Sequence, residues 1–203
     1  MRYLTDLRIE LRLKPKLSMA KKTFFLDRDG TINVDYNFVH TREEWTWCDG
    51  AVEAIRRIHE AGFQIVIVTN QSGIARGHYT AGQVEKLHRW VDSELEKEGV
   101  NIDLWLMAPH HPKFDPAPHT HPPKDRKPDT GMFLKADEQL NVDFSSSYMA
   151  GDKITDLQPA VELGITPFFI RSRHEPKQDK QWLKKHDIPI FDTLLDAVKS
   201  NRF

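Results

Sequence analysis

The sequence predicts an α/β fold in which helices cover both faces of a mainly parallel sheet. From residue 22 onward, short apolar segments alternate with amphipathic helical segments along the 203-residue chain, an alternation typical of βαβ crossovers. Residues 64–69 (QIVIVT) are β-branched and apolar on both faces, as in a strand buried within a parallel sheet. Because ligands bind at the carboxyl ends of such strands, the chemistry is expected there.

The first half of the chain predicts strands at 23–27, 64–69 and 103–107 and helices at 51–61 and 80–98. In both helical segments the apolar residues recur every three or four positions, which places them on one helical face. Gly62 and Gly99 follow these segments as helix stops, and Thr80 is a favourable N-cap for the second helix.

The second half predicts strands at 147–152, 166–171 and 188–191 and helices at 131–140, 156–164 and from about residue 193 onward. The charged segment 171–187 is interpreted as solvated, with no indication of nucleic-acid binding. His59, His88 and His186 lie in or near helical segments and are interpreted as surface residues.

Composition is that of an ordinary globular domain. Charged residues make up 29% and hydrophobic residues 39%, and the net charge is −1, so neither nucleic acid nor a membrane is an expected partner. The single cysteine, Cys48, excludes an internal disulfide and weakly favours the cytoplasm. Residues 1–18 are interpreted as an N-terminal extension to a single domain over 19–203, with an edge strand or oligomerisation arm as the alternative.

Polar residues follow the expected strands at several points. The sequences that carry them are LDRDGT (26–31), TNQSG (69–73), RKP (126–128) and GDKITD (151–156). Any one of these could be a solvated turn, but a series of them at strand ends is expected to meet at one edge of the sheet.

The residue types at these positions suit the hydrolysis of a phosphate ester. Mg²⁺ held by Asp27, Asp29 and Asp152 would reduce the repulsion between a carboxylate nucleophile and a phosphate. Asp27 is the expected nucleophile, and Asp29 would protonate the leaving alcohol and then activate water. Lys127 and the Thr69 hydroxyl would neutralise and orient the phosphoryl oxygens.

In order, DRDGT, VTN, K and GDKITD resemble the four motifs of the haloacid dehalogenase superfamily of Mg²⁺-dependent phosphotransferases. More closely, FLDRDGTINVD, VTNQSGIARG, RKPDTGM and GDKITD resemble the D-glycero-D-manno-heptose 1,7-bisphosphate 7-phosphatase group, over about residues 19–200. The resemblance implies a Rossmann-like three-layer α/β/α domain with a mainly parallel sheet, no large cap domain and a monomeric state.

The resemblance also implies a ligand set and a substrate site. Mg²⁺ would be held by the carboxylates of Asp27 and Asp152 and by the backbone carbonyl of Asp29. The residues implied to contact the substrate are Asp35, Tyr36, Asn37, Phe38, Asn70, Gln71, Ser72, Arg126 and Lys153. Among them, Arg126 would bind a second phosphate or the sugar.

The segment 109–128 departs from this pattern. Many relatives bind a structural zinc there through Cys-x-His and Cys-x-Cys pairs, but this segment contains no cysteine. A zinc site built from His110, His119 and His121 is one interpretation. The preferred interpretation is a metal-free loop stiffened by its seven prolines.

The leading hypothesis is a phosphatase that removes the 7-phosphate of D-glycero-D-manno-heptose 1,7-bisphosphate, a small phosphorylated sugar, in the cytoplasm. A histidinol-phosphate phosphatase or another small phosphosugar phosphatase is the nearest alternative, although Arg126 favours recognition of a second phosphate. The alternative outside the enzyme class is a phosphosugar-binding protein without turnover. The presence of both Asp27 and Asp29 disfavours it, because binding alone needs neither a nucleophile nor an acid.

Overall fold

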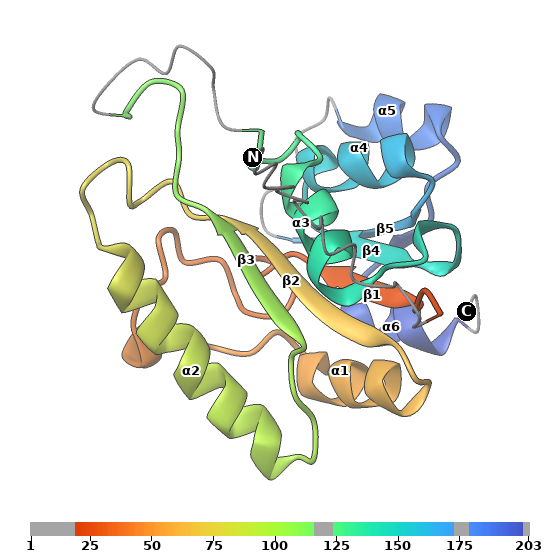
Figure 1. The fold of residues 1–203 in the computed structure, drawn as a ribbon, viewed down its shortest axis with the longest axis horizontal. Helices are drawn as coiled ribbons and strands as arrows, with labels where there is room; N and C mark the ends of the chain where they lie inside the picture. The colour runs from red at the N-terminus through yellow and green to blue at the C-terminus, as the bar shows by residue number, and fades with distance from the viewer. Residues whose placement is uncertain (1–18, 116–123, 173–178, 201–203) are drawn as a thin grey trace, which may run out of the picture.

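The computed structural model describes residues 19–115, 124–172 and 179–200. Its strands are β1 (Thr23–Leu26), β2 (Gln64–Asn70), β3 (Leu104–Ala108), β4 (Tyr148–Gly151), β5 (Thr166–Ile170) and β6 (Ile190–Phe191). All adjacent strands pair in parallel, in the order β3-β2-β1-β4-β5-β6 (Figure 1). The predicted parallel sheet is confirmed, while the extension predicted over residues 1–18 lies outside the described residues.

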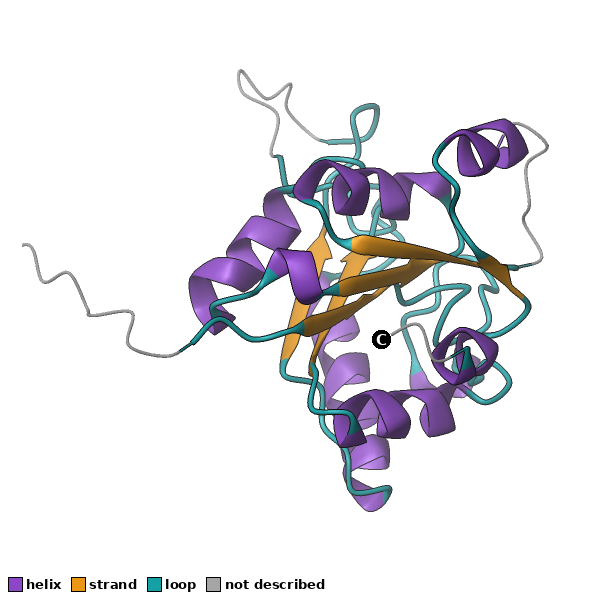
Figure 2. Cartoon of the chain, turned by 90° about the vertical axis from the view of Figure 1, so that its right-hand side faces the viewer, coloured by secondary structure: helices purple, strands orange, loops and turns teal. Residues whose placement is uncertain are grey.

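Helices lie on both faces of the sheet (Figure 2). They are α1 (Ala51–Glu60), α2 (Ala81–Lys97), α3 (Gly131–Leu140), α4 (Ile154–Leu163), α5 (Asp179–Lys185) and α6 (Leu194–Lys199), with 3-10 turns η1 (Arg42–Glu44) and η2 (Phe144–Ser146). The helices α1, α2 and α6 pack on one face, and α3, α4 and α5 pack on the other. This arrangement confirms the predicted three-layer α/β/α architecture.

The strand period of two divides the core into two halves. Phe24 and Leu26 of β1 point to the face covered by α1, α2 and α6, whereas Phe25 points to the opposite face. There the Phe25 ring lies 4.8 Å from the ring of Phe133 on α3. Since β1 is flanked by β2 and β4, the residues that leave these three strands meet at one edge of the sheet.

The structure differs from the sequence prediction after β5. The segment 171–187 was interpreted as solvated, but α5 forms within it and Leu183 is buried against the second half of the core. Short helices of this kind depend on tertiary packing more than on their own propensity, so a charged sequence gives little local signal for them.

In the described part of the chain, no helix is long and apolar enough to cross a membrane.

Truncation of Phe133 should show how much the aromatic contact in the core contributes. We expect Phe133→Ala to lower the free energy of unfolding by about 3–5 kcal/mol, because the ring is fully buried. Leu134→Ala is the matched control: its side chain is 45% exposed, and the expected change is within about 0.5 kcal/mol. Urea unfolding curves would measure both, and equal losses would contradict the assigned core.

Candidate active site

The buried ammonium group of Lys127 joins three separate segments. Its Nζ lies 2.7 Å from Asp27 Oδ1 at the end of β1 and 2.8 Å from Asp156 Oδ1 on α4. It also donates to the carbonyl oxygen of Val68 at 2.7 Å. An ammonium group has three N–H donors, so each has one acceptor here.

Asn70 holds the backbone of Lys127 in place. Its Nδ2 donates to the Lys127 carbonyl at 3.0 Å, and its Oδ1 accepts from the Lys127 N–H at 3.1 Å. Both ends of the Asn70 amide are therefore occupied by the main chain beside the site. Contact between Asn70 and the substrate stays a prediction.

The carboxylates of Asp27, Asp152 and Asp156 form a possible cation site. One oxygen from each lies within 4.8 Å of the other two. Asp152 is fully buried, and Lys153 Nζ lies 3.4 Å from its Oδ1. Within the described residues neither oxygen accepts a well-aligned hydrogen bond, which is costly for a charged group. A hard divalent cation takes oxygen ligands of this kind, so the donor set fits one.

The turn after β1 allows Asp152 to approach. Gly30 has a φ of +93°, and a Cβ at this position would lie 2.3 Å from Asp152 Oδ2. A larger residue would therefore displace the carboxylate as well as adopt a strained backbone. This is the physical reason for glycine in the sequence LDRDGT.

Burial dominates the protonation of the cation site when no cation is bound. It raises the pKa of Asp27 to about 6, despite the opposing charge of Lys127, and it raises the pKa of Asp152 to about 8. Burial also opposes the charge on Lys127, but the carboxylates of Asp156 and Asp27 outweigh it and raise the pKa of Lys127. A bound divalent cation would favour the ionised carboxylates.

Asp29 has a different environment, although it is only two residues from Asp27. Arg28 donates to both of its oxygens, and Asn33 and Gln71 each donate at 3.0 Å. Burial alone would raise the pKa of Asp29, but the Arg28 guanidinium and these hydrogen bonds hold it below its ordinary value. Without substrate, Asp29 is therefore ionised, as its predicted role as a base requires.

Gln71 links Asp29 to Thr69. Its Nε2 also donates to Thr69 Oγ1 at 2.9 Å, and its Oε1 accepts from the Tyr79 hydroxyl at 2.7 Å. Gln71 was expected to line the substrate site, but its side chain is buried and its amide lies between two expected catalytic residues. Substrate contact by Gln71 stays a prediction beside this positioning role.

Sequence reasoning missed several residues of the site. Arg28 and Asn33 were given no role, and Asp156 was noted without one. The position of Arg28 between two aspartates was the available signal for a buried ion pair. His88 was interpreted as a surface residue, which is wrong: it is only 5% exposed, because α2 packs against β3 at this point.

The predicted substrate loop follows the first turn. Asn37 and Phe38 have positive φ values of 65° and 59°, and a left-handed backbone is unusual for a residue as large as Phe. Tyr36 and Phe38 are exposed, and Lys153 Nζ lies 3.5 Å from Asp35 Oδ2. The structure thus brings Asp35 beside Lys153, while the Phe38 ring lies against His78.

Two arginines contact the turn formed by residues 110–115. Arg126 donates to the His110 carbonyl at 3.0 Å. Arg76 stacks on the Phe114 ring at 3.9 Å and lies 3.4 Å from His111 Nε2. Burial lowers the pKa of Arg126; the Asp115 carboxylate opposes this shift and the Arg76 cation adds to it. Ser72 is partly exposed at the start of the loop that carries Arg76.

The zinc interpretation is not decided by these contacts. His110 Nδ1 lies 3.8 Å from Asp115 Oδ2, while His119 and His121 lie outside the described residues. Across 19–115, 124–172 and 179–200, the cluster with metal-ligand spacing is the aspartate one. A zinc site at His110, His119 and His121 stays one of two open interpretations.

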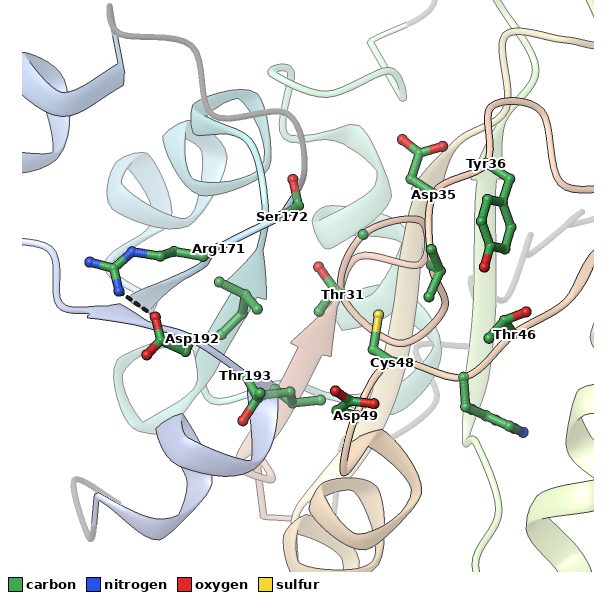
Figure 3. Close-up of a pocket in the computed structure, with 15 residues that line it drawn as sticks. Thr31, Asp35, Tyr36, Thr46, Cys48, Asp49, Arg171, Ser172, Asp192 and Thr193 are labelled. Carbon is green, nitrogen blue, oxygen red and sulfur yellow. Dashed lines mark hydrogen bonds and ion pairs between the residues drawn. The ribbon is translucent and has the colours of Figure 1, made fainter.

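A cavity of about 530 Å³ lies next to the turn after β1 and is lined there by residues between 30 and 36 (Figure 3). Thr31, Cys48 and Asp49 line one side, and the ion pair of Arg171 and Asp192 lies on the other. Burial raises the pKa of the Cys48 thiol to about 12, so it stays protonated at neutral pH. Cys48 is therefore no rival nucleophile to Asp27.

Fold and site together define a haloacid dehalogenase-like phosphatase. Residues 22–164 match the family model described as polynucleotide kinase 3 phosphatase, and the chain belongs to this family. The predicted superfamily and the predicted phosphatase class are confirmed.

More particular relatives are known. A protein named D-glycero-beta-D-manno-heptose-1,7-bisphosphate 7-phosphatase from Yersinia pestis is 44% identical over 157 residues, which is 77% of this chain and 84% of that protein. A protein of the same name from Haemophilus ducreyi is 37% identical over 182 residues, covering 89% of this chain and 98% of the relative.

Solved structures agree with these relatives. The crystal structure of a D,D-heptose 1,7-bisphosphate phosphatase from B. bronchiseptica, complexed with magnesium and phosphate, has a TM-score of 0.74 and 28% identity. The similarity covers 88% of this chain and 97% of that one. Phosphatases of this superfamily need a divalent metal, and the buried aspartate cluster is where this chain can hold one.

The cation site should control stability as well as activity. In the folded, metal-free protein the pKa of Asp152 is raised from 3.8 to about 8, so its contribution to stability is present below about pH 4 and is lost as the pH rises through 8. At pH 7.5, Mg²⁺ at about 100 times its Kd should raise Tm by roughly 5–10 °C, measured by thermal unfolding.

Asp152→Asn keeps the shape of the side chain but removes the ionisable group, so folding at pH 7.5 no longer requires this side chain to take up a proton. Its metal-free Tm at pH 7.5 should exceed that of the parent, and Mg²⁺ should no longer raise it. An unchanged response to Mg²⁺ in this variant would contradict the assigned cation site.

Proposed function

We propose that this chain removes the 7-phosphate of D-glycero-D-manno-heptose 1,7-bisphosphate, using Asp27 as the nucleophile. The observation that carries the proposal is the buried cluster of Asp27, Lys127, Asp152 and Asp156 at the end of β1, with Asp29 beside it. Relatives named for this activity share 44% identity over most of the chain, which supports the substrate.

In the first half of the reaction, an oxygen of Asp27 attacks phosphorus and the bond between phosphorus and the sugar oxygen breaks. Asp29 gives a proton to the departing sugar oxygen, which leaves as an alcohol. The substrate phosphate brings negative charge close to Asp29, and this raises the pKa of a neighbouring carboxyl. Substrate binding therefore favours the protonated Asp29 that this half needs.

In the second half, water attacks the aspartyl-phosphate and releases inorganic phosphate. The ionised Asp29 takes a proton from this water, the role that suits its hydrogen bonds in the substrate-free protein. Lys127 and Thr69 neutralise and orient the phosphoryl oxygens. Bound to Asp27, Asp152 and the backbone carbonyl of Asp29, with Asp156 close by, Mg²⁺ would supply charge neutralisation for the phosphate.

The sugar and the second phosphate of the substrate are assigned to three segments: residues 35–38, the loop after β2, and the segment that contains Arg126. Asp35, Tyr36, Asn37 and Phe38 supply one wall, and Lys153 lies next to Asp35. Asn70 ends β2, and Gln71 and Ser72 begin the second loop. We assign the anomeric phosphate to Arg126, helped by Arg76. The support is that both guanidinium groups contact the turn 110–115, and arginine binds phosphate in a bidentate manner.

The finer properties follow from this proposal. Magnesium is the expected metal, the enzyme is expected to act as a cytoplasmic monomer, and neither nucleic acid nor a membrane is an expected partner. Measuring kcat/KM on both anomers of heptose 1,7-bisphosphate, on histidinol phosphate and on common sugar monophosphates tests the substrate. A preference for histidinol phosphate, or equal rates on all of them, would contradict the proposed substrate.

The Asp27→Asn variant tests the nucleophile. We expect Mg²⁺-dependent phosphate release to fall by about 10⁴-fold or more, as when a covalent nucleophile is removed from other enzymes. Phosphate release can be followed with a colorimetric assay. Glu138→Gln, an exposed carboxylate on α3, is the control and should keep the parent rate. Substantial turnover by Asp27→Asn would exclude an aspartyl-phosphate intermediate.

The Arg126→Met and Arg76→Met variants test recognition of the second phosphate. Each should raise KM for the bisphosphate by about 10- to 100-fold, because a charge-assisted hydrogen bond is lost, while KM for a monophosphate ester stays near the parent value. Steady-state kinetics on the two substrates measure this. Arg56→Met on the outer face of α1 is the matched control, and an equal rise for both substrates would argue against this subsite.

A further inference from the structure

Arg28 is a large side chain that is fully buried beside the active site. It continues the alternation of β1 and reaches the face covered by α2. Its Nε and Nη2 donate to Asp29 Oδ2 and Oδ1 at 3.0 and 2.9 Å, and Nη2 also donates to the Val39 carbonyl at 2.6 Å. The Arg28 guanidinium thus forms a bidentate contact with the Asp29 carboxylate.

The remaining nitrogen of this fork contacts His88 on α2. Arg28 Nη1 lies 3.3 Å from His88 Nε2. Because an arginine has only donors, His88 Nε2 is the acceptor and the ring proton of the neutral imidazole is on Nδ1. All three nitrogens of the buried guanidinium therefore have an acceptor, and His88 supplies the one on the side away from Asp29.

The imidazole of His88 is held from its other side by β3. It stacks on the Trp105 ring at a centroid distance of 4.0 Å and an interplanar angle of 18°. Trp105 Nε1 in turn donates to Asp92 Oδ1 at 2.8 Å, and Asp92 follows His88 by one helical turn. Burial, together with the Arg28 cation, lowers the pKa of His88 to about 3, so the ring stays neutral at physiological pH.

We infer that His88 is a positioning residue for the reaction: through Arg28 it holds the Asp29 carboxylate in place for proton transfer. Arginine has four side-chain torsions, and two contacts outside Asp29 fix its guanidinium: Nη2 donates to the Val39 carbonyl and Nη1 to His88 Nε2. Without an acceptor at His88 Nε2, a buried donor loses its partner, and the guanidinium turns toward another acceptor and releases Asp29. The anchor lies on α2 and touches neither the phosphate nor the cation site.

This inference rests on the proposed role of Asp29 as general acid. Substrates with different leaving groups distinguish a failure of that role from a failure of the inference about His88. An alkyl phosphate needs a proton on its departing oxygen, whereas p-nitrophenyl phosphate releases an anion that is stable without one. A misplaced Asp29 should therefore lower kcat/KM selectively for the alkyl ester, because kcat/KM covers only the steps up to departure of the leaving group. Hydrolysis of the aspartyl-phosphate, which also uses Asp29, is common to both esters. General destabilisation of the fold or damage to Asp27 would slow both esters.

The experiment compares kcat/KM on p-nitrophenyl phosphate and on the alkyl phosphate that the parent hydrolyses fastest. We expect His88→Leu to lower kcat/KM of the alkyl ester by about 10- to 100-fold, part of the usual effect of general acid catalysis, and kcat/KM of p-nitrophenyl phosphate by less than about 3-fold. His88→Gln, whose Oε1 can accept from Arg28 Nη1, should recover most of the loss. Leu95→Ala, a buried residue on the same helix, should lower Tm without changing the ratio of the two rates.

Asp29→Asn distinguishes the possible failures. If Asp29→Asn lowers kcat/KM of both esters equally, the proposed role of Asp29 as general acid is wrong and the inference falls with it. If Asp29→Asn is selective but His88→Leu slows both esters equally, or neither, only the inference is overturned. Should His88→Leu not fold, the same ratio is measured with His88→Asn, whose shorter amide cannot reach Arg28.

Discussion

The ammonium group of Lys127 is the contact on which the active site depends. It joins the end of β1, the backbone of β2 and the start of α4 through three buried contacts. Without it, the carboxylates of Asp27 and Asp156 would face each other in a site closed to water. With Asp152 and Lys153, whose Nζ lies 3.4 Å from Asp152 Oδ1, the site holds three carboxylates and two ammonium groups, which leaves one negative charge when all are ionised. A divalent cation more than balances that charge.

Two aspartates only two residues apart acquire opposite properties from their neighbours. Asp27 lies in the buried cation site, where desolvation raises its pKa, whereas Asp29 lies between Arg28, Asn33 and Gln71, which lower it. In enzymes, two nearby carboxylates take different roles, nucleophile and acid or base, when their environments give them different pKa values. Strand alternation alone would place residues 27 and 29 on the same face. They differ because β1 ends at Leu26 and Asp29 belongs to the turn that follows, where Arg28, Asn33 and Gln71 surround it.

Much of the fold could be predicted because its signals are local. The apolar segments and the glycine and threonine boundaries indicated every strand and five of the six helices, and α5 was missed because its one buried leucine lies in a charged segment. Within the site, the motifs indicated Asp27, Asp29, Thr69, Lys127 and Asp152. The roles of Gln71 and Asn70 could not be predicted, because their amides bond to partners 42 and 57 residues away.

The sequence by itself determined the parallel α/β architecture, the phosphatase motifs and the superfamily, since each depends on periodicity or on short contiguous runs of residues. Only the tertiary structure decided that Asp156 shares Lys127 with Asp27 and that Arg28 bonds to His88 on α2. The helical pattern shows which face of α2 is apolar. It does not show that the buried guanidinium of Arg28 lies against that face and donates to His88. Such partners are chosen by the packing of distant segments, because a buried donor must find an acceptor wherever the fold provides one.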